Sequence, residues 1–432
     1  MAAAVIGRFF AMIANSSPPV IVVGAGPAGA TAARVLALAG WPVWLLDRAA
    51  FPRNKPCGGG ISFRVLVRFP YLRERLSSIA THTVGRLHLE GPDGESTIVE
   101  SDGPAGLMIR RVEFDALLVA LAQEAGAQLV TGADIVHARE DDETVTLKTR
   151  DGQSFRAPIV IAADGVHSVV ARRLGINGGW PAAAVALDLM EETPRTELRD
   201  RDPSTMWVCY GCNPGGDPPV KGSSAPKGYA YIFPKRDHVN VGIGYILSHY
   251  REAIGGAPYE IQRELVARLR RDGVVAGESI RRNFTPALIP VAGPLRNPAS
   301  RRVLLAGDAG GFVNGLTAEG IYYGMVSGEL AARAVTDSRG NPAILARRFQ
   351  KLWNNEIGAE LRDSVLLQRY VFADRRRIAR IVSGARREPA LTRVILDWLA
   401  GRAPYAQARR AVIARAPLLA VRLAWDAVTG RR

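Results

Sequence analysis

The sequence predicts an α/β protein in which a Rossmann-like nucleotide-binding domain is interleaved with an antiparallel β-sheet domain and followed by a helical C-terminal region. Three observations support this fold class. Residues 20–48 read as strand, glycine-rich turn, helix and strand. Short alternating segments with turn signals recur in the middle of the chain, and arginine-rich helical patterns fill its end.

The nucleotide-binding domain is expected to be discontinuous, because apolar runs that suit a parallel sheet occur on both sides of the alternating segments. The predicted parts are residues 1–80, 106–180 and 281–345 for the nucleotide-binding domain, 81–105 and 181–280 for the antiparallel substrate domain, and 346–432 for the basic helical region.

Gly24, Gly26 and Gly29 have the spacing G-x-G-x-x-G between the first apolar run and the helix. Gly24 permits a tight turn, Gly26 lets the backbone approach a pyrophosphate, and Gly29 lets the helix pack on the strand. Asp47 ends the second strand, 23 residues after Gly24, where it can accept hydrogen bonds from a ribose. The alternative is that Asp47 is an acidic residue at the end of a strand with no role in binding. The stretch therefore predicts a dinucleotide at the N-terminus of the helix.

Composition limits the class of protein. The 432 residues are 47% hydrophobic, which is enough for a large core. The sequence contains no uninterrupted window of about 18 apolar residues, so no membrane-spanning helix is predicted. The first nineteen residues lack the marks of a signal peptide and are expected to lie on the surface. Three cysteines agree with a reducing compartment, so we expect a cytoplasmic protein.

Cys209 and Cys212 form a C-x-x-C at the start of a Gly-, Pro- and Ser-rich loop over residues 211–228. No second pair of ligands stands at zinc-binding spacing, so no metal site is predicted. Plain thiols and a local disulfide both remain open.

Cys57 is followed by three glycines, Gly58, Gly59 and Gly60, in a loop after the second strand. Consecutive glycines remove the side chains from a stretch of backbone, which suits contact with a flat ring. A flexible linker is the alternative. Cys57 is the only side chain in this group of four.

The remaining pattern predicts a hairpin over residues 81–99, a helix over 110–126, strands at 128–130 and 135–136, a hairpin over 144–155, and a buried strand that ends at Asp164-Gly165. A last apolar strand ends at Gly307-Asp308. A helix is expected to begin near Thr317, with Gly320, Gly324 and Gly328 spaced four apart for close backbone contact.

Tyr229, Tyr231 and Phe233 alternate on one strand and precede Pro234. An aromatic stripe of this kind packs in a core more often than it lines a pocket. Both roles stay open on the sequence pattern alone.

The three fingerprints, Gly24 to Asp47, Asp164-Gly165 and Gly307-Asp308, resemble those of the p-hydroxybenzoate hydroxylase-like flavoproteins. Within that superfamily the chain resembles the geranylgeranyl reductases, through Pro56-Cys57-Gly58-Gly59, Tyr229-Ala-Tyr-Ile-Phe-Pro234 and Asn240-Val-Gly-Ile-Gly244. The resemblance covers residues 19–361. The family motif reads Tyr-x-Trp-x-Phe-Pro, and Tyr231 stands at the Trp position, which bears on pocket shape and hence on chain length or head group.

The resemblance implies FAD as cofactor and a hydrophobic isoprenoid substrate. The cofactor-binding positions are Gly24, Gly26, Ala28, Gly29, Asp47, Arg48, Cys57, Gly58, Gly60, Arg111, Ile135, Asp164, Gly307, Asp308, Gly320 and Ile321. The substrate-binding positions are Tyr229, Tyr231, Phe233 and Pro234.

The implied reaction is saturation of prenyl C=C bonds on a lipid, quinone or pigment precursor. An isolated alkene accepts hydride only after protonation to a tertiary cation, and aromatic faces can stabilise that cation without trapping it. No residue stands out as the acid, so Cys57 and Tyr229 are the catalytic nominees. The single dinucleotide fingerprint is assigned to FAD, which leaves NADPH or reduced ferredoxin as the electron donor.

Two other functions stay open. A flavin-dependent monooxygenase or halogenase on a hydrophobic substrate would share the FAD fingerprints, although the Trp-x-Trp-x-Ile-Pro stretch of a halogenase is absent. An electron-transfer flavoprotein to a membrane quinone normally uses an iron–sulfur cluster, which three cysteines in this arrangement do not hold.

The net charge of +15 is concentrated at the C-terminal end, where residues 369–432 contain 15 Arg and four acids. Apolar residues at helical spacing, from Val412 to Ala427, lie among arginines. Packing on the protein itself is one explanation. The other is peripheral contact with the inner face of a membrane, because several Arg near anionic headgroups contribute about 1 kcal/mol each. Nucleic acid is not an expected partner.

Overall fold

The computed structural model describes residues 20–92, 94–215 and 226–414. It divides the chain into two compact units, unit 1 with Met1–Lys55, Arg111–Ala186 and Leu288–Leu367, and unit 2 with Pro56–Arg110, Leu187–Ala287 and Gln368–Arg432. These units group residues 56–80 with the antiparallel sheet, whereas the sequence pattern assigned them to the nucleotide-binding domain. The three-part functional division stays a prediction. The leader, part of the 211–228 loop and the positions beyond 414 lie outside the described residues.

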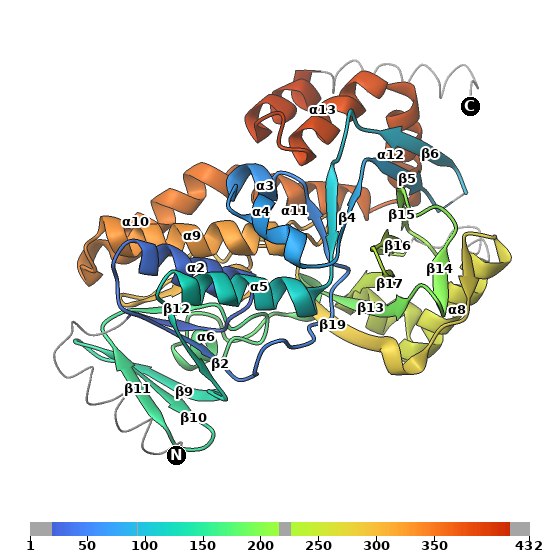
Figure 1. Ribbon diagram of the computed structural model, residues 1–432. Helices are drawn as coiled ribbons and strands as arrows, with labels where there is room; N and C mark the ends of the chain where they lie inside the picture. The colour runs from blue at the N-terminus through green and yellow to red at the C-terminus, as the bar shows by residue number, and fades with distance from the viewer. Residues whose placement is uncertain (1–19, 93, 216–225, 415–432) are drawn as a thin grey trace. The chain divides into compact units, whose positions relative to one another are not determined.

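Unit 1 is built on a five-stranded parallel sheet with strand order β20-β12-β1-β2-β8 (Figure 1). All residues of the first four of these strands are buried, as is typical of parallel strands that are covered on both faces. The strands are β1 (Val20–Val23), β2 (Val43–Asp47), β8 (Gln128–Thr131), β12 (Val160–Ala162) and β20 (Val303–Leu305).

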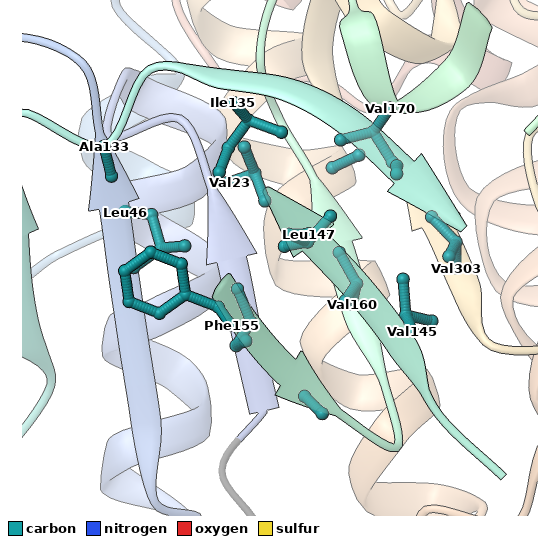
Figure 2. Packing of buried hydrophobic residues seen from close by; sticks show 14 of the residues in the cluster. Val23, Leu46, Ala133, Ile135, Val145, Leu147, Phe155, Val160, Val170 and Val303 are labelled. Atoms are coloured by element: carbon teal, nitrogen blue, oxygen red, sulfur yellow. The ribbon is translucent and has the colours of Figure 1, made fainter. Parts of the chain in front are cut away.

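Helices cover one face of the parallel sheet, and a three-stranded antiparallel sheet covers the other. Figure 2 shows side chains of both sheets, among them Leu46, Leu147, Phe155 and Val160, in one buried cluster. The helices are α2 (Pro27–Leu38), α5 (Arg111–Glu124), α9 (Ile321–Asp337) and α10 (Pro342–Trp353), and the second sheet contains β9 (Ile135–Glu140), β10 (Val145–Thr149) and β11 (Ser154–Ala157). Helix α11 (Ala359–Val371) follows α10 in the chain. The predicted helix at 110–126 and the hairpin at 144–155 are confirmed.

The helices α2 and α9 approach one another through side-chain-free backbone. A Cβ at Gly328 would lie 2.1 Å from the carbonyl oxygen of Ala28, a distance that no Cβ adopts. One turn earlier, a Cβ at Gly324 would lie 3.8 Å from the Cβ of Ala28. The predicted close backbone contact along this helix is therefore confirmed, and its partner is the helix that follows the glycine-rich turn.

The start of α9 corrects the sequence prediction. The helix begins at Ile321, four residues after Thr317. Ala318 has a φ of 55°, in the left-handed region, and the Asn314 side-chain oxygen accepts the backbone N–H groups of Leu316 and Thr317 at 3.0 Å. This side chain stabilises a turn in place of the first helical turn.

Unit 2 contains a seven-stranded sheet with strand order β19-β13-β17-β16-β15-β5-β6. Its strands are β5 (Arg86–Glu90), β6 (Ser96–Glu100), β13 (Val185–Pro194), β15 (Thr205–Tyr210), β16 (Gly228–Pro234), β17 (His238–Ile246) and β19 (Phe284–Pro290). The pairing of β5 with β6 confirms the hairpin predicted over residues 81–99. Helix α8 (Pro258–Arg271) packs on one face of the sheet through Ile261, Leu265 and Leu269.

Smaller elements complete both units. The short strands are β3 (Gly60–Ser62), β4 (Thr81–Val84), β7 (Gly106–Ile109), β14 (Leu198–Asp200) and β18 (Val275–Gly277). The remaining named α-helices are α3 (Val65–Arg68), α4 (Leu72–Arg75), α6 (Val169–Arg173), α7 (Leu247–His249), α12 (Arg375–Arg387) and α13 (Pro389–Leu399).

Cys209 and Cys212 are buried free thiols on the side of the seven-stranded sheet that faces α8. An Arg268 Nη1 donor lies 2.6 Å from the Cys212 Sγ. The hydrogen bond from Cys209 and the nearby guanidinium lower the pKa of Cys212, while the same thiol pair and burial raise the pKa of Cys209. The structure thus favours plain thiols over a disulfide.

The contact between α2 and α9 leads to a stability prediction. Gly328→Ala should lower the free energy of unfolding by about 1 to 3 kcal/mol, because the new methyl group meets backbone and not a movable side chain. Gly384→Ala, in the last turn of α12, is the control. No atom lies within 4 Å of its Cβ position, so it should stabilise the protein by up to about 1 kcal/mol. Urea unfolding of both variants tests the prediction, and equal stabilities would contradict it.

Candidate functional site

The glycine-rich turn of unit 1 combines two crowded glycines with one open glycine. Gly24 has a φ of 92°, and a Cβ at Gly29 would lie 1.8 Å from the Gly24 carbonyl oxygen, so the turn and α2 pack as predicted. At Gly26, the nearest atom to a Cβ would be Arg53 Nη2 at 3.7 Å. Gly26 is the N-cap of α2 and has no side-chain capping bond. Bare backbone and the positive end of the helix dipole therefore meet there.

Asp47 fixes this turn from the end of β2. Its Oδ2 accepts the Ala25 N–H at 2.8 Å and its Oδ1 accepts the Ala49 N–H at 2.9 Å. Each carboxylate oxygen has a further lone pair, so the side chain can still accept a ribose hydroxyl. Arg48, the next residue, is exposed.

The second and third fingerprints lie against the first within unit 1. A Cβ at Gly24 would lie 3.0 Å from the Asp164 Cα, and a Cβ at Gly307 would lie 2.9 Å from that of Ala28. A Cβ at Gly320 would lie 3.4 Å from Asp308 Oδ1. The structure therefore brings these three segments together around the start of α2.

Asp164 and Asp308 are carboxyl groups whose pKa values are raised by burial. Asp164 Oδ2 accepts the backbone N–H groups of Val169 and Val170 at 2.8 and 3.2 Å, which holds the start of α6. Its Oδ1 is buried and has no hydrogen-bond partner in the part of the chain that the structure describes. Lys55 and Arg111 partly offset the effect of burial on Asp308.

The side chains of Arg111 and Ile135 both make contacts within unit 1. Both Asp115 oxygens accept hydrogen bonds from Arg111, at 2.6 and 2.7 Å, and Arg53 pairs with the same buried carboxylate at 3.2 Å. The Ile135 side chain packs in the cluster between the two sheets of unit 1. Ile321 is buried in the first turn of α9.

In unit 2, the glycine loop carries protein rings on its backbone. A Cβ at Gly58 would lie 2.9 Å from the Phe233 ring and 3.2 Å from the Tyr231 ring, and a Cβ at Gly60 would lie 3.0 Å from Phe233. The loop is held by the Asn240 side-chain amide, which donates to the Cys57 carbonyl at 3.2 Å. The flexible-linker alternative is therefore disfavoured, and contact of this loop with the flavin stays a prediction.

The aromatic side chains form a continuous row on β15 and β16. Ring centroids lie 4.5 Å apart for Tyr231–Phe233, 6.1 Å for Tyr229–Tyr231 and 5.2 Å for Tyr210–Tyr229. Tyr231 is buried, whereas Tyr229 and Phe233 are partly exposed. Pro234 ends the strand and is also buried.

Two glycines of the neighbouring strand β17 lie opposite two of these aromatic residues. Gly242 pairs with Tyr231, and Gly244 pairs with Tyr229, across β16 and β17. A Cβ at Gly242 would lie 2.5 Å from the Tyr231 hydroxyl. The motif Asn240-Val-Gly-Ile-Gly244 thus leaves the backbone of β17 without a side chain where the Tyr231 ring crosses it.

Sequence patterns did not identify two buried polar groups beside this row. Asp188 of β13 accepts hydrogen bonds from Tyr231, and Lys235 pairs with Glu192, which also accepts from Arg110 at 2.7 Å. A Cβ at Gly59 would lie 2.9 Å from the Lys235 Nζ. Burial lowers the pKa of Lys235. The alternation along β13 is the signal that could have placed Asp188 and Glu192 on the same face.

Comparisons with known proteins agree with these features. The family described as FAD binding domain matches residues 17–327. Menaquinone reductase of Mycobacterium tuberculosis is 33% identical over 356 residues, covering 78% of this chain and 82% of that protein. Digeranylgeranylglycerophospholipid reductase 1 of Methanopyrus kandleri is 33% identical over 348 residues, covering 78% and 86%.

Solved structures share the fold. A geranylgeranyl bacteriochlorophyll reductase-like protein of Thermoplasma acidophilum has a TM-score of 0.72 at 22% identity, covering 85% of this chain and 91% of that one. The flavin-dependent brominase Bmp2 has a TM-score of 0.68 at 16% identity, covering 89% and 94%. At these identities the likeness concerns the fold alone.

The fold and these residues define a FAD-dependent oxidoreductase. The chain belongs to the family of FAD-binding flavoproteins and, within it, to the geranylgeranyl reductases, as the sequence resemblance indicated.

The residues of unit 1 fit FAD. Gly26 offers open backbone at a helix N-terminus, Asp47 keeps free lone pairs, and Asp164 Oδ1 is a buried acceptor without a protein partner among the described residues. We expect the pyrophosphate at Gly26 and hydroxyl contacts at Asp47 and Asp308.

The open space at Gly26 allows binding to be separated from folding. Gly26→Ala should leave the free energy of unfolding of the flavin-free protein within about 0.5 kcal/mol of wild type, because φ is −74° and no atom lies within 3.7 Å. FAD affinity should fall about tenfold or more, a loss of about 1.4 kcal/mol, since the methyl group occupies the pyrophosphate position. Titration of flavin-free protein with FAD measures this. An unchanged dissociation constant would contradict the assignment of Gly26.

Proposed function

We propose that this enzyme saturates C=C bonds in the prenyl chain of a lipid, quinone or pigment precursor. The names of its relatives support this substrate class, since they act on menaquinone or on digeranylgeranylglycerophospholipid. The observation that carries the proposal is the aromatic row, whose Phe233 and Tyr231 rings lie on the glycine loop expected to contact the flavin.

The chemistry needs a hydride donor, a proton donor and a surface that tolerates a cation. FAD, when reduced, supplies the hydride. Tyr229, Tyr231 and Phe233 offer aromatic faces that stabilise a tertiary cation without adding to it, in place of water. Burial keeps the pKa of Tyr231 well above its usual value, so its phenol stays protonated.

We also propose candidates for the proton donor and for the electron donor. Cys57 and Tyr229 are the nominees for proton transfer to the alkene. Cys57 lies on the glycine loop, and Tyr229 lies in the aromatic row. NADPH or a reduced ferredoxin is the proposed electron source. The full set of cofactor- and substrate-binding positions named from the sequence is proposed with them.

Mass spectrometry of prenyl lipid and quinone extracts, incubated anaerobically with dithionite-reduced enzyme, tests the function. We expect mass gains of two hydrogens for each double bond that is reduced, and none with dithionite-reduced free FAD as control. Extracts that stay unchanged would contradict the proposal. A gain of oxygen or halogen in air would instead favour the monooxygenase or halogenase alternative.

We further propose peripheral attachment to the inner face of a membrane, where prenyl lipids reside. Among the described residues no helix is both long and apolar enough to cross a membrane. Helix α12 buries Ile378 and Val382, which are 1% exposed, and Val382 packs in the same cluster as Tyr231. The exposed basic and large apolar side chains of the arginine-rich C-terminal surface include Arg376, Arg380, Ile381, Arg386, Arg387, Arg393, Ile395, Arg402, Arg409, Arg410, Val412 and Ile413. Basic and apolar groups together suit an anionic interface.

Charge reversal tests attachment. Replacing Arg376, Arg380, Arg409 and Arg410 with Glu should abolish sedimentation with liposomes that contain phosphatidylglycerol, because each Arg contributes about 1 kcal/mol near the surface. The control reverses four exposed arginines of unit 1, Arg150, Arg156, Arg172 and Arg301, and so has the same net charge. If the variant reversed at the C-terminal surface co-sediments at the wild-type level, with an unchanged flavin spectrum, attachment through this surface is contradicted.

A further inference from the structure

Asp188 and Tyr231 form a buried pair that the sequence motifs do not predict. The Tyr231 hydroxyl lies 3.2 Å from both carboxylate oxygens of Asp188. Tyr231 is 4% exposed and Asp188 is 5% exposed, so water does not screen the pair. Tyr231 reaches Asp188 by crossing β17 at Gly242, where any larger residue would meet the ring.

The pair lies on the face of the sheet that carries the aromatic row. Met190, two residues after Asp188, belongs to the same buried cluster as Tyr231. Glu191 lies on the opposite face, where it accepts hydrogen bonds from Ser279 and the Ile280 N–H. Only one of these two buried carboxylates of β13 therefore acts on the row.

We propose that Asp188, acting through the Tyr231 hydroxyl, makes the Tyr231 ring the cation-stabilising face of the substrate site. The inference rests on the proposed function, since it concerns the cation formed when a prenyl double bond is protonated. In this role Asp188 is a positioning residue, and Tyr231 is the group that meets the substrate.

The physical reason is polarisation of the phenol. A hydroxyl that donates to a carboxylate becomes more electron-rich at oxygen, and this density extends into the ring, where it strengthens attraction to a cation. In a buried site that attraction is not weakened by water. The carboxylate is itself buried and lies at the hydroxyl end of the phenol, so it acts on the cation through Tyr231.

The arrangement also assigns a purpose to the Tyr at position 231, where the family motif has Trp. A Tyr ring alone binds cations less strongly than an indole. The Asp188 carboxylate compensates for that difference, and Gly242 leaves room for the hydroxyl to reach it. Position 188 and position 231 should therefore be exchangeable only together.

A binding experiment on the holoenzyme tests this without turnover. The probe is a geranylgeranyl analogue with a tertiary amine at a branched position, which is protonated at pH 7, and the reference is its neutral hydrocarbon isostere. Wild-type enzyme should bind the ammonium about tenfold more tightly, the scale of a desolvated cation–π contact. Asp188→Asn should bind both ligands alike, and so should Tyr231→Phe, which keeps the ring.

The control and the coupling of the two positions complete the test. Glu191→Gln removes a buried carboxylate from the same strand and should keep the tenfold preference. The double variant Asp188→Asn/Tyr231→Phe should show no further loss beyond either single variant. A preserved ammonium preference in Asp188→Asn would overturn the proposal.

Failure of this inference is distinguishable from failure of the function. If wild-type enzyme adds two hydrogens to prenyl chains while Asp188→Asn keeps both its preference for the ammonium and its rate, the function stands and the role of Asp188 falls. If wild-type enzyme reduces no prenyl chain, the proposed function falls first. FAD content and melting temperature of each variant show whether the fold is intact.

Discussion

The ring of Tyr231 can cross strand β17 only because residue 242 has no side chain, and the arrangement of unit 2 around the aromatic row depends on that contact. The hydroxyl reaches Asp188 on β13, and the ring edge touches the glycine loop at Gly58. Phe233 stacks beside it, 4.5 Å away, and lies on Gly60. Glycines on two separate segments thus bring aromatic rings, a buried carboxylate and a ring-contacting loop onto one face.

The same constraint organises unit 1. The backbone of α9 meets Ala28 of α2 at Gly328, and the start of each helix is thereby held beside the other. Gly307, which precedes Asp308, also lies against Ala28 in the first turn of α2. Close approach of backbones, together with the hydrogen bonds between the parallel strands, brings the three fingerprints together.

Carboxylates that are shared between two cations, one of them buried and one half-buried, hold the surrounding loops. Asp115 pairs with Arg111 and Arg53, and Glu192 accepts from both Lys235 and Arg110. Breaking one partner of such a group leaves a desolvated charge, so these networks restrict the loops to one arrangement. The glycine loop is fixed in this way, because the Lys235 ammonium lies directly behind Gly59.

The sequence by itself determined the parallel-sheet unit, the glycine-rich turn, the antiparallel hairpins and the residue types of the cofactor site, since period, turn residues and motif spacing are local signals. It also indicated the aromatic row, but not whether that row packs or binds. Only the tertiary structure decided that Tyr231 reaches Asp188 and that Lys235 backs Gly59, because these contacts join residues 43 positions apart in one case and about 176 in the other across different strands. The start of α9 was likewise decided by a side-chain bond of Asn314 that no periodicity contains.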